Sequence, residues 1–116
     1  MGKMSSNGPG PFRSYRKSQW GSKCPGPALV FVKAEWCGHC QAAKPEVAKA
    51  ARLLGSAVPT YAIDADKHPD LVNAWGVEGF PTIFYVSQTG RRTDYGGERR
   101  GQAIGDWVCN KSNRCG

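Results

Sequence analysis

Residues 28–40, with the sequence ALVFVKAEWCGHC, decide the fold. The stretch opens with an apolar run, Ala28 to Val32, whose β-branched and aromatic side chains are typical of a strand buried on both faces. Two cysteines, Cys37 and Cys40, come shortly after this run, and a helical pattern begins beyond them. We therefore expect a buried strand that leads into a helix, with two thiols at the junction.

The chain beyond Cys40 alternates between helical and extended patterns. A helical stripe of apolar residues continues to about residue 54, where Gly55 is a stop signal, and Pro45 inside this helix must bend it or remove a hydrogen bond. Further strands are predicted at residues 58–63, 81–86 and 92–95, and further helices at residues 69–75 and 99–110. The order β-α-β-α-β-β-α predicts an α/β fold, in which helices cover both faces of a mixed sheet.

The composition limits the chain to one small domain with a basic beginning. Of the 116 residues, 40% are hydrophobic, which is enough for a packed interior and excludes wholesale disorder. The net charge is +7, and residues 1–27 contain Lys and Arg but no Asp or Glu, together with many Gly, Pro and Ser residues that resist packing. We predict a basic arm at residues 1–27, a folded domain at 28–110 and a short cysteine-containing tail at 111–116. The arm suits an acidic partner or surface, although a solubilising role is the simpler interpretation.

Targeting signals are sparse. No stretch approaches the roughly 18 apolar residues of a membrane span, and no apolar run follows the basic residues near the start, as a secretory signal would require. The last residues, Cys115-Gly116, do not form an endoplasmic-reticulum retention tail. These features predict a cytoplasmic location. Met1-Gly2 with Ser6 also fits the loose pattern for N-myristoylation at Gly2.

Cys37 and Cys40 carry the chemistry. The unpaired N–H groups and the dipole at the start of a helix stabilise a thiolate at Cys37, and a thiolate is the attacking species in disulfide exchange. Cys40, one helical turn further on, can then attack the mixed disulfide and release the product. Between them, His39 carries part of a positive charge near neutral pH, which would favour the dithiol form and hence oxidation or isomerisation of client thiols.

Half of a zinc site is the structural alternative for this pair. Zinc would need two more ligands at suitable spacing. The remaining candidates form no second Cys-x-x-Cys and no His-x3–5-His pair: His39, His68, Cys24, Cys109 and Cys115. We therefore expect neither a metal nor a cofactor.

The motif and its surroundings resemble the thioredoxin superfamily. Residues 36–40, WCGHC, are similar to the Cys-Gly-His-Cys active site of protein disulfide isomerase domains, and Pro45 matches the proline that bends the active-site helix. Residues 79–82, GFPT, resemble the family's Gly-x-Pro-Thr, and Pro81 follows Cys40 by 41 residues, as in a thioredoxin. The resemblance covers about residues 28–108 and implies the thioredoxin fold and thiol–disulfide exchange.

The resemblance also implies roles for the residues around the sulfurs. Pro81 is expected in a cis peptide bond against the cysteine pair, which leaves the neighbouring backbone free to pair with an extended client. Phe80 and Thr82 would shape client access. Trp36 is either a packing residue or a lid beside the sulfurs, and Gly38 completes the motif.

Arg99 lies in a segment similar to one that, in disulfide isomerases, brings an arginine near the second cysteine, and Arg100 is a weaker candidate. The buried acid that the family places six residues before the first cysteine is Phe31 here. Its usual lysine partner is Thr60. We therefore expect no buried ionic pair and slow release of the mixed disulfide. Lys33 and Glu35 are the nearest substitutes, and the sequence favours neither.

Two further departures concern the ends of the chain. The Gly/Pro-rich beginning makes a poor first strand, so we expect that strand to be missing or distorted and about four strands to remain. Cys109 and Cys115 flank a polar tail and can close a small disulfide ring, or remain thiols. Cys24 is then the odd cysteine, open to dimerisation or to pairing with the tail.

The leading hypothesis is a thiol–disulfide oxidoreductase with oxidase or isomerase character. Cys37 would be the nucleophile, Cys40 the resolving thiol, His39 the tuning residue and Pro81 the wall of the client site. Its clients would be protein thiols and disulfides, and its electron partner a dithiol or a glutathione-type thiol. The alternatives are a cytosolic thioredoxin-like reductase and a redox-inactive binding module with the same fold.

Overall fold

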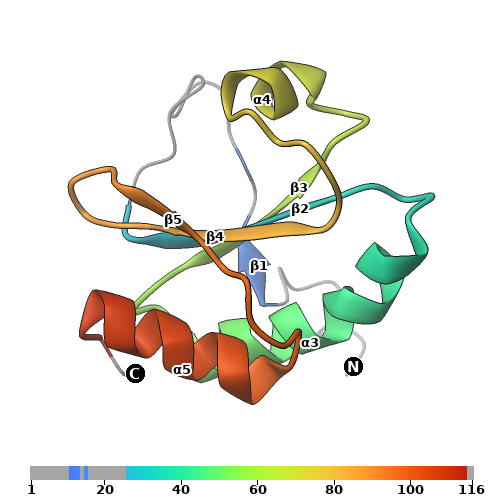
Figure 1. Ribbon diagram of the computed structural model, residues 1–116. Coiled ribbons are helices and arrows are strands. Elements are labelled where there is room, and N and C mark those ends of the chain that lie inside the picture. The colour runs from blue at the N-terminus through green and yellow to red at the C-terminus, as the bar shows by residue number, and fades with distance from the viewer. Residues whose placement is uncertain (1–10, 14, 16–25, 115–116) are drawn as a thin grey trace, which may run out of the picture.

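The computed structural model describes residues 11–13, 15 and 26–114 (Figure 1). Its elements, in chain order, are β1 (Phe12–Arg13), β2 (Ala28–Lys33), α3 (Gly38–Leu54), β3 (Thr60–Asp64), α4 (Pro69–Ala74), β4 (Thr82–Val86), β5 (Arg92–Asp94) and α5 (Gly101–Ser112). From residue 28 onward the predicted order is confirmed, with most element ends shifted by one or two residues. The predictions for Gly2, Cys24 and Cys115 concern residues outside the described part of the chain.

The sheet is mixed, and β2 lies at its centre. The strand order is β1-β3-β2-β4-β5. β3 runs parallel to both β1 and β2, whereas β4 is antiparallel to β2 and to β5. Every residue of β2 except Lys33 at its end is buried, as the continuous apolar run predicts for a strand covered on both faces.

Helices cover both faces of this sheet (Figure 1). Leu29 and Phe31 of β2 pack in one core cluster with the apolar stripe of α3 and with Ile104 and Val108 of α5. The alternate residues of β2 join a second cluster on the opposite face, which includes Leu71 of α4. The period-two alternation of a strand thus divides one apolar run between two layers.

The first strand corrects an expectation. It is present rather than missing, so the sheet has five strands instead of about four, although β1 is only two residues long. Phe12 pairs with Thr60 of β3 and stacks on the ring of Phe31, with ring centroids 6.3 Å apart. An apolar ring over the buried Phe31 is sufficient to bring this part of the predicted arm onto the sheet, and the Gly/Pro-rich sequence before it disfavours a longer strand.

The link from β2 to α3 positions the two cysteines. The chain leaves β2 after Lys33 and turns at Ala34, whose carbonyl accepts a hydrogen bond from the N–H of Cys37 at 3.1 Å. Cys37 is the N-cap of α3, and Pro45 lies inside the helix, as predicted.

Among the described residues, none of the helices has the length and apolar run that a membrane span requires.

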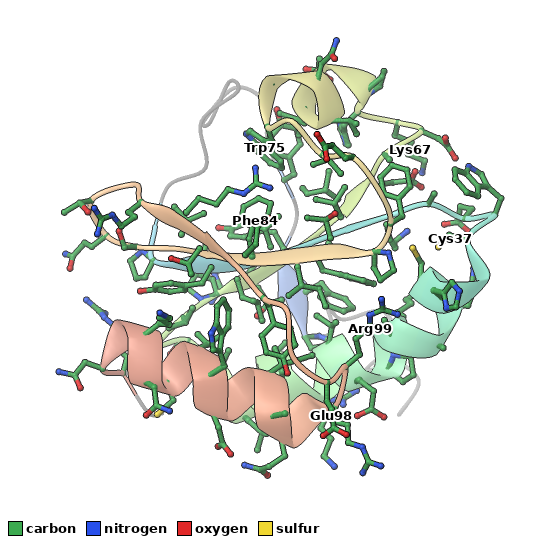
Figure 2. All side chains as sticks on the ribbon, viewed as in Figure 1. Cys37, Lys67, Trp75, Phe84, Glu98 and Arg99 are labelled. Atoms are coloured by element: carbon green, nitrogen blue, oxygen red, sulfur yellow. The ribbon has the colours of Figure 1, made fainter. Side chains whose placement is uncertain are left out.

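The opposite layer is anchored through Phe84, at the centre of β4 (Figure 2). The ring of Trp75, just after α4, meets the Phe84 ring edge-on with centroids 5.6 Å apart. The Arg92 guanidinium of β5 lies 4.3 Å from the Phe84 centroid and donates a hydrogen bond to the carbonyl of Trp75. These contacts hold the segment before Phe80 and Pro81 against the sheet.

Candidate active site

Cys37 and Cys40 are both free thiols on the first turn of α3. Cys37 is the N-cap of α3, and its sulfur accepts a hydrogen bond from the backbone N–H of Cys40, in the first turn of the helix, at 3.2 Å. A helix N-cap normally uses an oxygen to satisfy one of the unpaired N–H groups of the first turn. Here a sulfur takes that place, which positions it to be stabilised as an anion.

The pKa of the Cys37 thiol is lowered below its ordinary value. The largest cause is a hydrogen bond from the Cys40 side chain, and the backbone N–H groups of Cys40 and His39 add to it. Burial acts in the opposite direction, and the positive charge of Arg99 contributes a smaller lowering. Because all the favourable groups stabilise the thiolate, Cys37 is the thiol suited to nucleophilic attack.

Cys40 lies in the opposite environment. Its side chain is buried, and burial, followed by the hydrogen bond to Cys37, raises the pKa of its thiol to about 11. The backbone N–H of Ala34 and the charge of Lys33 act against this rise. Cys40 therefore stays protonated until the Cys37 sulfur is consumed, as a resolving thiol requires.

The segment before β4 forms the other wall of the site. The Phe80–Pro81 peptide bond is cis, as the resemblance implies, and the carbonyl of Phe80 lies 3.7 Å from Cys37 Sγ and accepts its hydrogen bond. Thr82 Oγ1 donates to the carbonyl of Gly79 at 2.6 Å, which closes the turn around the proline. Phe80 also packs against the apolar cluster of Ala34 and the two cysteines. The structure thus brings Phe80, Pro81 and the sulfurs together.

Trp36 lies beside the sulfurs and faces solvent. Its side chain is 70% exposed, its ring meets the Phe80 ring edge-on with centroids 5.8 Å apart, and its Nε1 donates to Asp66 Oδ1 at 3.4 Å. Of the two interpretations left open by the sequence, this exposure favours a surface beside the sulfurs over a packing residue. Asp66 is a neighbour that sequence reasoning missed, because nothing in its local pattern marks it as a partner of Trp36.

The motif residues Gly38 and His39 are both exposed. The His39 backbone N–H contributes to stabilising the Cys37 thiolate, whereas its imidazole is not among the causes of the lowered pKa. Arg99 lies in the loop before α5, on the side of the molecule where α3 begins (Figure 2), and its charge acts on Cys37. The approach of this arginine to the second cysteine, which the resemblance implies, stays a prediction.

The two positions at which the family places a buried acid and its lysine partner hold Phe31 and Thr60 in this chain. Phe31 is fully buried in the apolar cluster and stacked against Phe12. Thr60, at the position expected for a lysine, is 2% exposed, and its hydroxyl has no hydrogen-bond partner among the described residues. Charged side chains lie instead at the end of β2, where Lys33 Nζ is 3.2 Å from Glu35 Oε2 and 3.8 Å from Asp64 Oδ2.

Two further findings concern the other cysteines and metals. Cys109 is disulfide-bonded, but its predicted partner Cys115 lies outside the described residues, so this pairing stays a prediction. Within residues 11–13, 15 and 26–114, no group of three or more His, Cys, Asp or Glu side chains is arranged to hold a metal ion.

Comparison with known proteins identifies relatives of this arrangement. Residues 17–110 match the sequence model of the family named Thioredoxin. The chain is 51% identical to human protein disulfide-isomerase A6 over 70 residues, which cover 60% of this chain and 16% of that protein. It is 37% identical to the protein disulfide-isomerase A6 homolog of Caenorhabditis elegans over 78 residues, 66% of this chain and 18% of that protein. The chain thus spans less than a fifth of these curated relatives.

Solved structures share the fold. The J-Trx1 fragment of ERdj5 superposes with a TM-score of 0.77 at 14% identity, over 87% of this chain and 51% of that one. Human ERp44 form I superposes with a TM-score of 0.75 at 21% identity, over 86% of this chain and 29% of that one. At these identities the likeness concerns the fold alone.

The expected cytoplasmic location is contradicted by these comparisons. The protein disulfide-isomerase A6 relatives are proteins of the endoplasmic reticulum, which points away from the cytoplasm. The expectation was drawn from the ends of the sequence, whereas the comparisons concern the folded domain. By its match over residues 17–110 the chain belongs to the thioredoxin family.

Proposed function

We propose that this protein exchanges disulfides with protein clients through Cys37 and Cys40, and that it acts mainly as an oxidase or isomerase. The observation that carries the proposal is the opposite environment of two thiols one helical turn apart. The pKa of Cys37 is lowered at the helix N-cap, whereas burial raises that of Cys40 to about 11. In such a pair, one cysteine is a thiolate that attacks the client, and the other stays protonated until it resolves the mixed disulfide.

The exchange proceeds in two balanced steps. When the pair is reduced, the Cys37 thiolate attacks a client disulfide, a Cys37–client mixed disulfide forms, and one client sulfur leaves as a thiolate that takes a proton from solvent. Cys40 then loses its proton and attacks Cys37 Sγ, so that the Cys37–Cys40 disulfide forms and the second client sulfur is released. The client gains two electrons and the pair loses two. Oxidation of a client dithiol is the same sequence in reverse.

The wall at Phe80 and Pro81 supports an extended protein client. The carbonyl of Phe80 faces Cys37 Sγ, and the exposed Trp36 ring extends the apolar surface beside it. A client strand laid along this segment would pair with its backbone and bring a cysteine to Cys37. Protein thiols and disulfides are therefore the proposed clients, and a dithiol or glutathione-type thiol the electron partner.

The direction of exchange follows from what stabilises the reduced pair. Each hydrogen bond or charge that favours the Cys37 thiolate favours the dithiol form over the disulfide, which makes the disulfide a stronger oxidant. A reductase is the alternative if the rest of the domain outweighs these contacts.

The reduction potential of the pair tests this direction. The full chain is equilibrated with glutathione buffers of graded ratio and quenched by alkylation, and the peptide that contains Cys37 and Cys40 is quantified by mass spectrometry, so the other cysteines need no substitution. We expect a potential near the roughly −180 mV of disulfide isomerases. A value near the roughly −270 mV of thioredoxin would establish the reductase instead.

A trapping experiment tests the activity itself. The Cys40→Ala variant is expected to accumulate a mixed disulfide with a client protein that contains scrambled disulfides, because Cys37 attacks a client disulfide and one client sulfur leaves, but nothing then releases the product. The Cys37→Ser variant is the matched control and should trap nothing. Equal trapping by both variants, or no redox couple at residues 37 and 40, would favour a redox-inactive binding module.

A further inference from the structure

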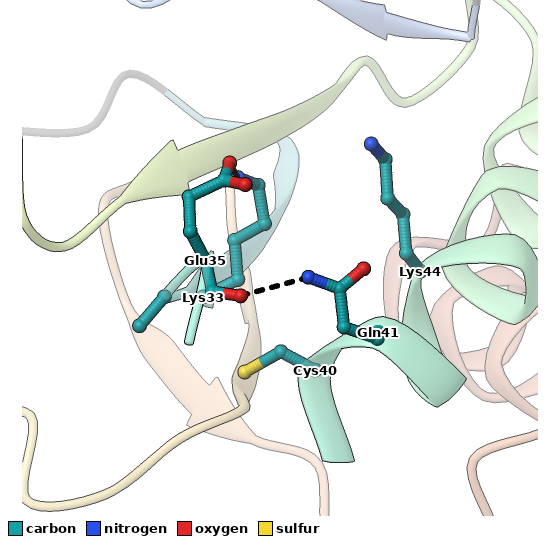
Figure 3. Close-up of a pocket in the computed structure, with 6 residues that line it drawn as sticks. Lys33, Glu35, Cys40, Gln41 and Lys44 are labelled. Carbon is teal, nitrogen blue, oxygen red and sulfur yellow. Dashed lines mark hydrogen bonds and ion pairs between the residues drawn. The ribbon is translucent and has the colours of Figure 1, made fainter. Parts of the chain in front are cut away.

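Cys40 must lose its proton before it can resolve a mixed disulfide, yet its side chain is 1% exposed. The fully buried Phe31 lies in the neighbouring core and offers no group that could help. A small pocket reaches Cys40 from outside and is lined by Lys33, Ala34, Glu35, Cys40, Gln41 and Lys44 (Figure 3). Its volume of about 20 Å³ is enough for one water molecule.

The walls of this pocket come from two elements. Lys33 and Glu35 stand at and just beyond the end of β2, and Gln41 and Lys44 stand on α3 (Figure 3). Gln41 Nε2 donates to the carbonyl of Glu35 at 2.9 Å, a bond that ties the two walls together beside Cys40. The opening is therefore a built feature of the junction between strand and helix.

Lys33 is the charge most firmly held in these walls. Its side chain is only 15% exposed, compared with 72% for Glu35. Nζ lies 3.2 Å from Glu35 Oε2 and 3.8 Å from Asp64 Oδ2, and Lys33 is paired in register with Asp64 across β2 and β3. Two carboxylates thus hold an ammonium group at the edge of the pocket that contains the Cys40 sulfur.

The other charged groups around the pair act differently. The positive charge of Arg99 acts on Cys37, Lys44 is exposed on the α3 wall, and His39 faces solvent. Among the described charged residues that line the pocket, Lys33 combines burial with two carboxylate partners, and its charge works against the burial that raises the pKa of the Cys40 thiol. A positive charge near a forming thiolate lowers the free energy of that thiolate.

We propose that Lys33 is the electrostatic partner of Cys40 in the resolving step, and that one water molecule in the pocket carries the Cys40 proton to solvent. The proposal rests on the proposed function. The Cys40 S–H bond breaks as the water takes the proton, the Cys40 thiolate forms beside Lys33, and it attacks Cys37 Sγ. The Cys37–Cys40 bond then forms, and the client sulfur leaves with the electron pair. Glu35 and Asp64 hold Lys33 in place and do not receive the proton.

The test follows the two steps separately. Reduced full-length protein is mixed with oxidised glutathione, quenched with acid at short times and analysed by mass spectrometry, which counts the Cys37–glutathione adduct and its disappearance across a range of pH. In Lys33→Met we expect an unchanged first step and a resolving step slower by about five-fold near neutral pH, from the loss of one nearby charge. The pH at which resolution becomes fast should also rise.

Three further variants separate charge from structure. Lys33→Arg keeps the charge and should resolve at nearly the normal rate, and Lys67→Met removes an exposed lysine away from the pocket and should change nothing. Glu35→Gln removes a negative charge and should resolve as fast as the normal protein or faster. Circular dichroism and urea unfolding of each variant verify that the fold is kept.

The outcomes distinguish this proposal from the proposed function. Absence of any glutathione adduct in the unmodified protein would overturn both. Normal resolution in Lys33→Met, or slow resolution in Lys33→Arg, would overturn the role of Lys33 alone. Slow resolution in Glu35→Gln together with normal resolution in Lys33→Met would show that the carboxylate takes the proton, and would overturn the water route.

Discussion

The Cys37 thiol is stabilised as an anion by groups within one helical turn of it, together with one charge from a distant loop. The Cys40 side chain and the backbone N–H groups of residues 39 and 40 provide the local part, and Arg99 the distant part. Because thiolates are the species that alkylate, Cys37 should react with iodoacetamide at a pH below that at which ordinary thiols react, and Cys40 only well above it. Peptide mapping after short pulses at graded pH measures both profiles.

Arg99→Gln tests the distant part of this stabilisation. Removing the charge should raise the pKa of Cys37, so that at neutral pH its alkylation slows by about two- to three-fold, a modest effect because Arg99 is exposed and screened by solvent. Arg91→Gln, which removes an exposed arginine from the hairpin, is the matched control. Equal rates in both variants would mean that the helix start alone activates Cys37.

Thr60 carries a buried hydroxyl that finds no partner among the described residues. Burying a polar group without a hydrogen bond is unfavourable, and valine has nearly the same shape without the oxygen. We expect Thr60→Val to raise the free energy of unfolding by about 1 kcal/mol in urea titrations. Thr89→Val is the contrasting control, because the Thr89 hydroxyl lies 3.0 Å from that of Ser87, so its loss should bring no gain.

At the scale of elements, a polar contact joins α3 and α5 beside their apolar interface. Glu46 Oε1 of α3 accepts a hydrogen bond at 2.8 Å from the N–H of Gly101, the first residue of α5. Arg100, the N-cap of α5, makes no side-chain capping bond, so Glu46 supplies the acceptor and a negative charge at the positive end of the helix dipole. Glu46→Ala should lower the free energy of unfolding by about 1–2 kcal/mol.

Glu78→Ala, at an exposed position, is the control for that measurement and should stay within about 0.5 kcal/mol of the unmodified protein. If the two variants have the same free energy of unfolding, the contact between Glu46 and Gly101 does not stabilise the packing of the two helices.

A further prediction concerns β1, whose main contact with the core is the ring of Phe12. Phe12 stacks on Phe31 and packs against the core, whereas the side chain of Arg13 is exposed. Truncating a partly buried ring removes apolar burial and leaves a gap, so Phe12→Ala should cost about 1–3 kcal/mol of unfolding free energy. Arg13→Ala in the same strand should change the free energy of unfolding little. An equal loss in both variants would mean that the pairing of β1 with β3, and not the Phe12 ring, supplies the stability.

At the scale of the whole molecule, the burial of Cys40 links stability to pH. Its pKa is raised from an ordinary 9.0 to about 11, so the unfolded thiol ionises at a pH where the folded one does not. The stability of the reduced protein that comes from this group is therefore complete below about pH 9 and is lost as the pH rises toward 11. The difference in unfolding free energy between Cys37→Ser and Cys37→Ser/Cys40→Ala should fall across this range, and a constant difference would contradict a buried neutral thiol.

The sequence predicted most of this molecule because long apolar runs and turn residues decide β2, β3, β4 and the helices locally. It missed β1, because two residues are too few to form a pattern and their stability comes from the contact of Phe12 with Phe31, which are distant in sequence. Cys37 and Cys40 were identified by spacing alone. The backbone N–H of His39 also favours the Cys37 thiolate, a contribution that no side-chain pattern reveals, and the role of its imidazole stays a prediction.

The two strands at the ends of the sheet are also its shortest, with two residues in β1 and three in β5. Long, flat, exposed strand edges invite neighbouring chains to add a strand and so to aggregate. Both short edges carry charged side chains, Arg13 in β1 and the Arg92–Asp94 ion pair in β5. The sheet of this protein thus offers the extended clients of the proposed function little edge to which they could add a strand.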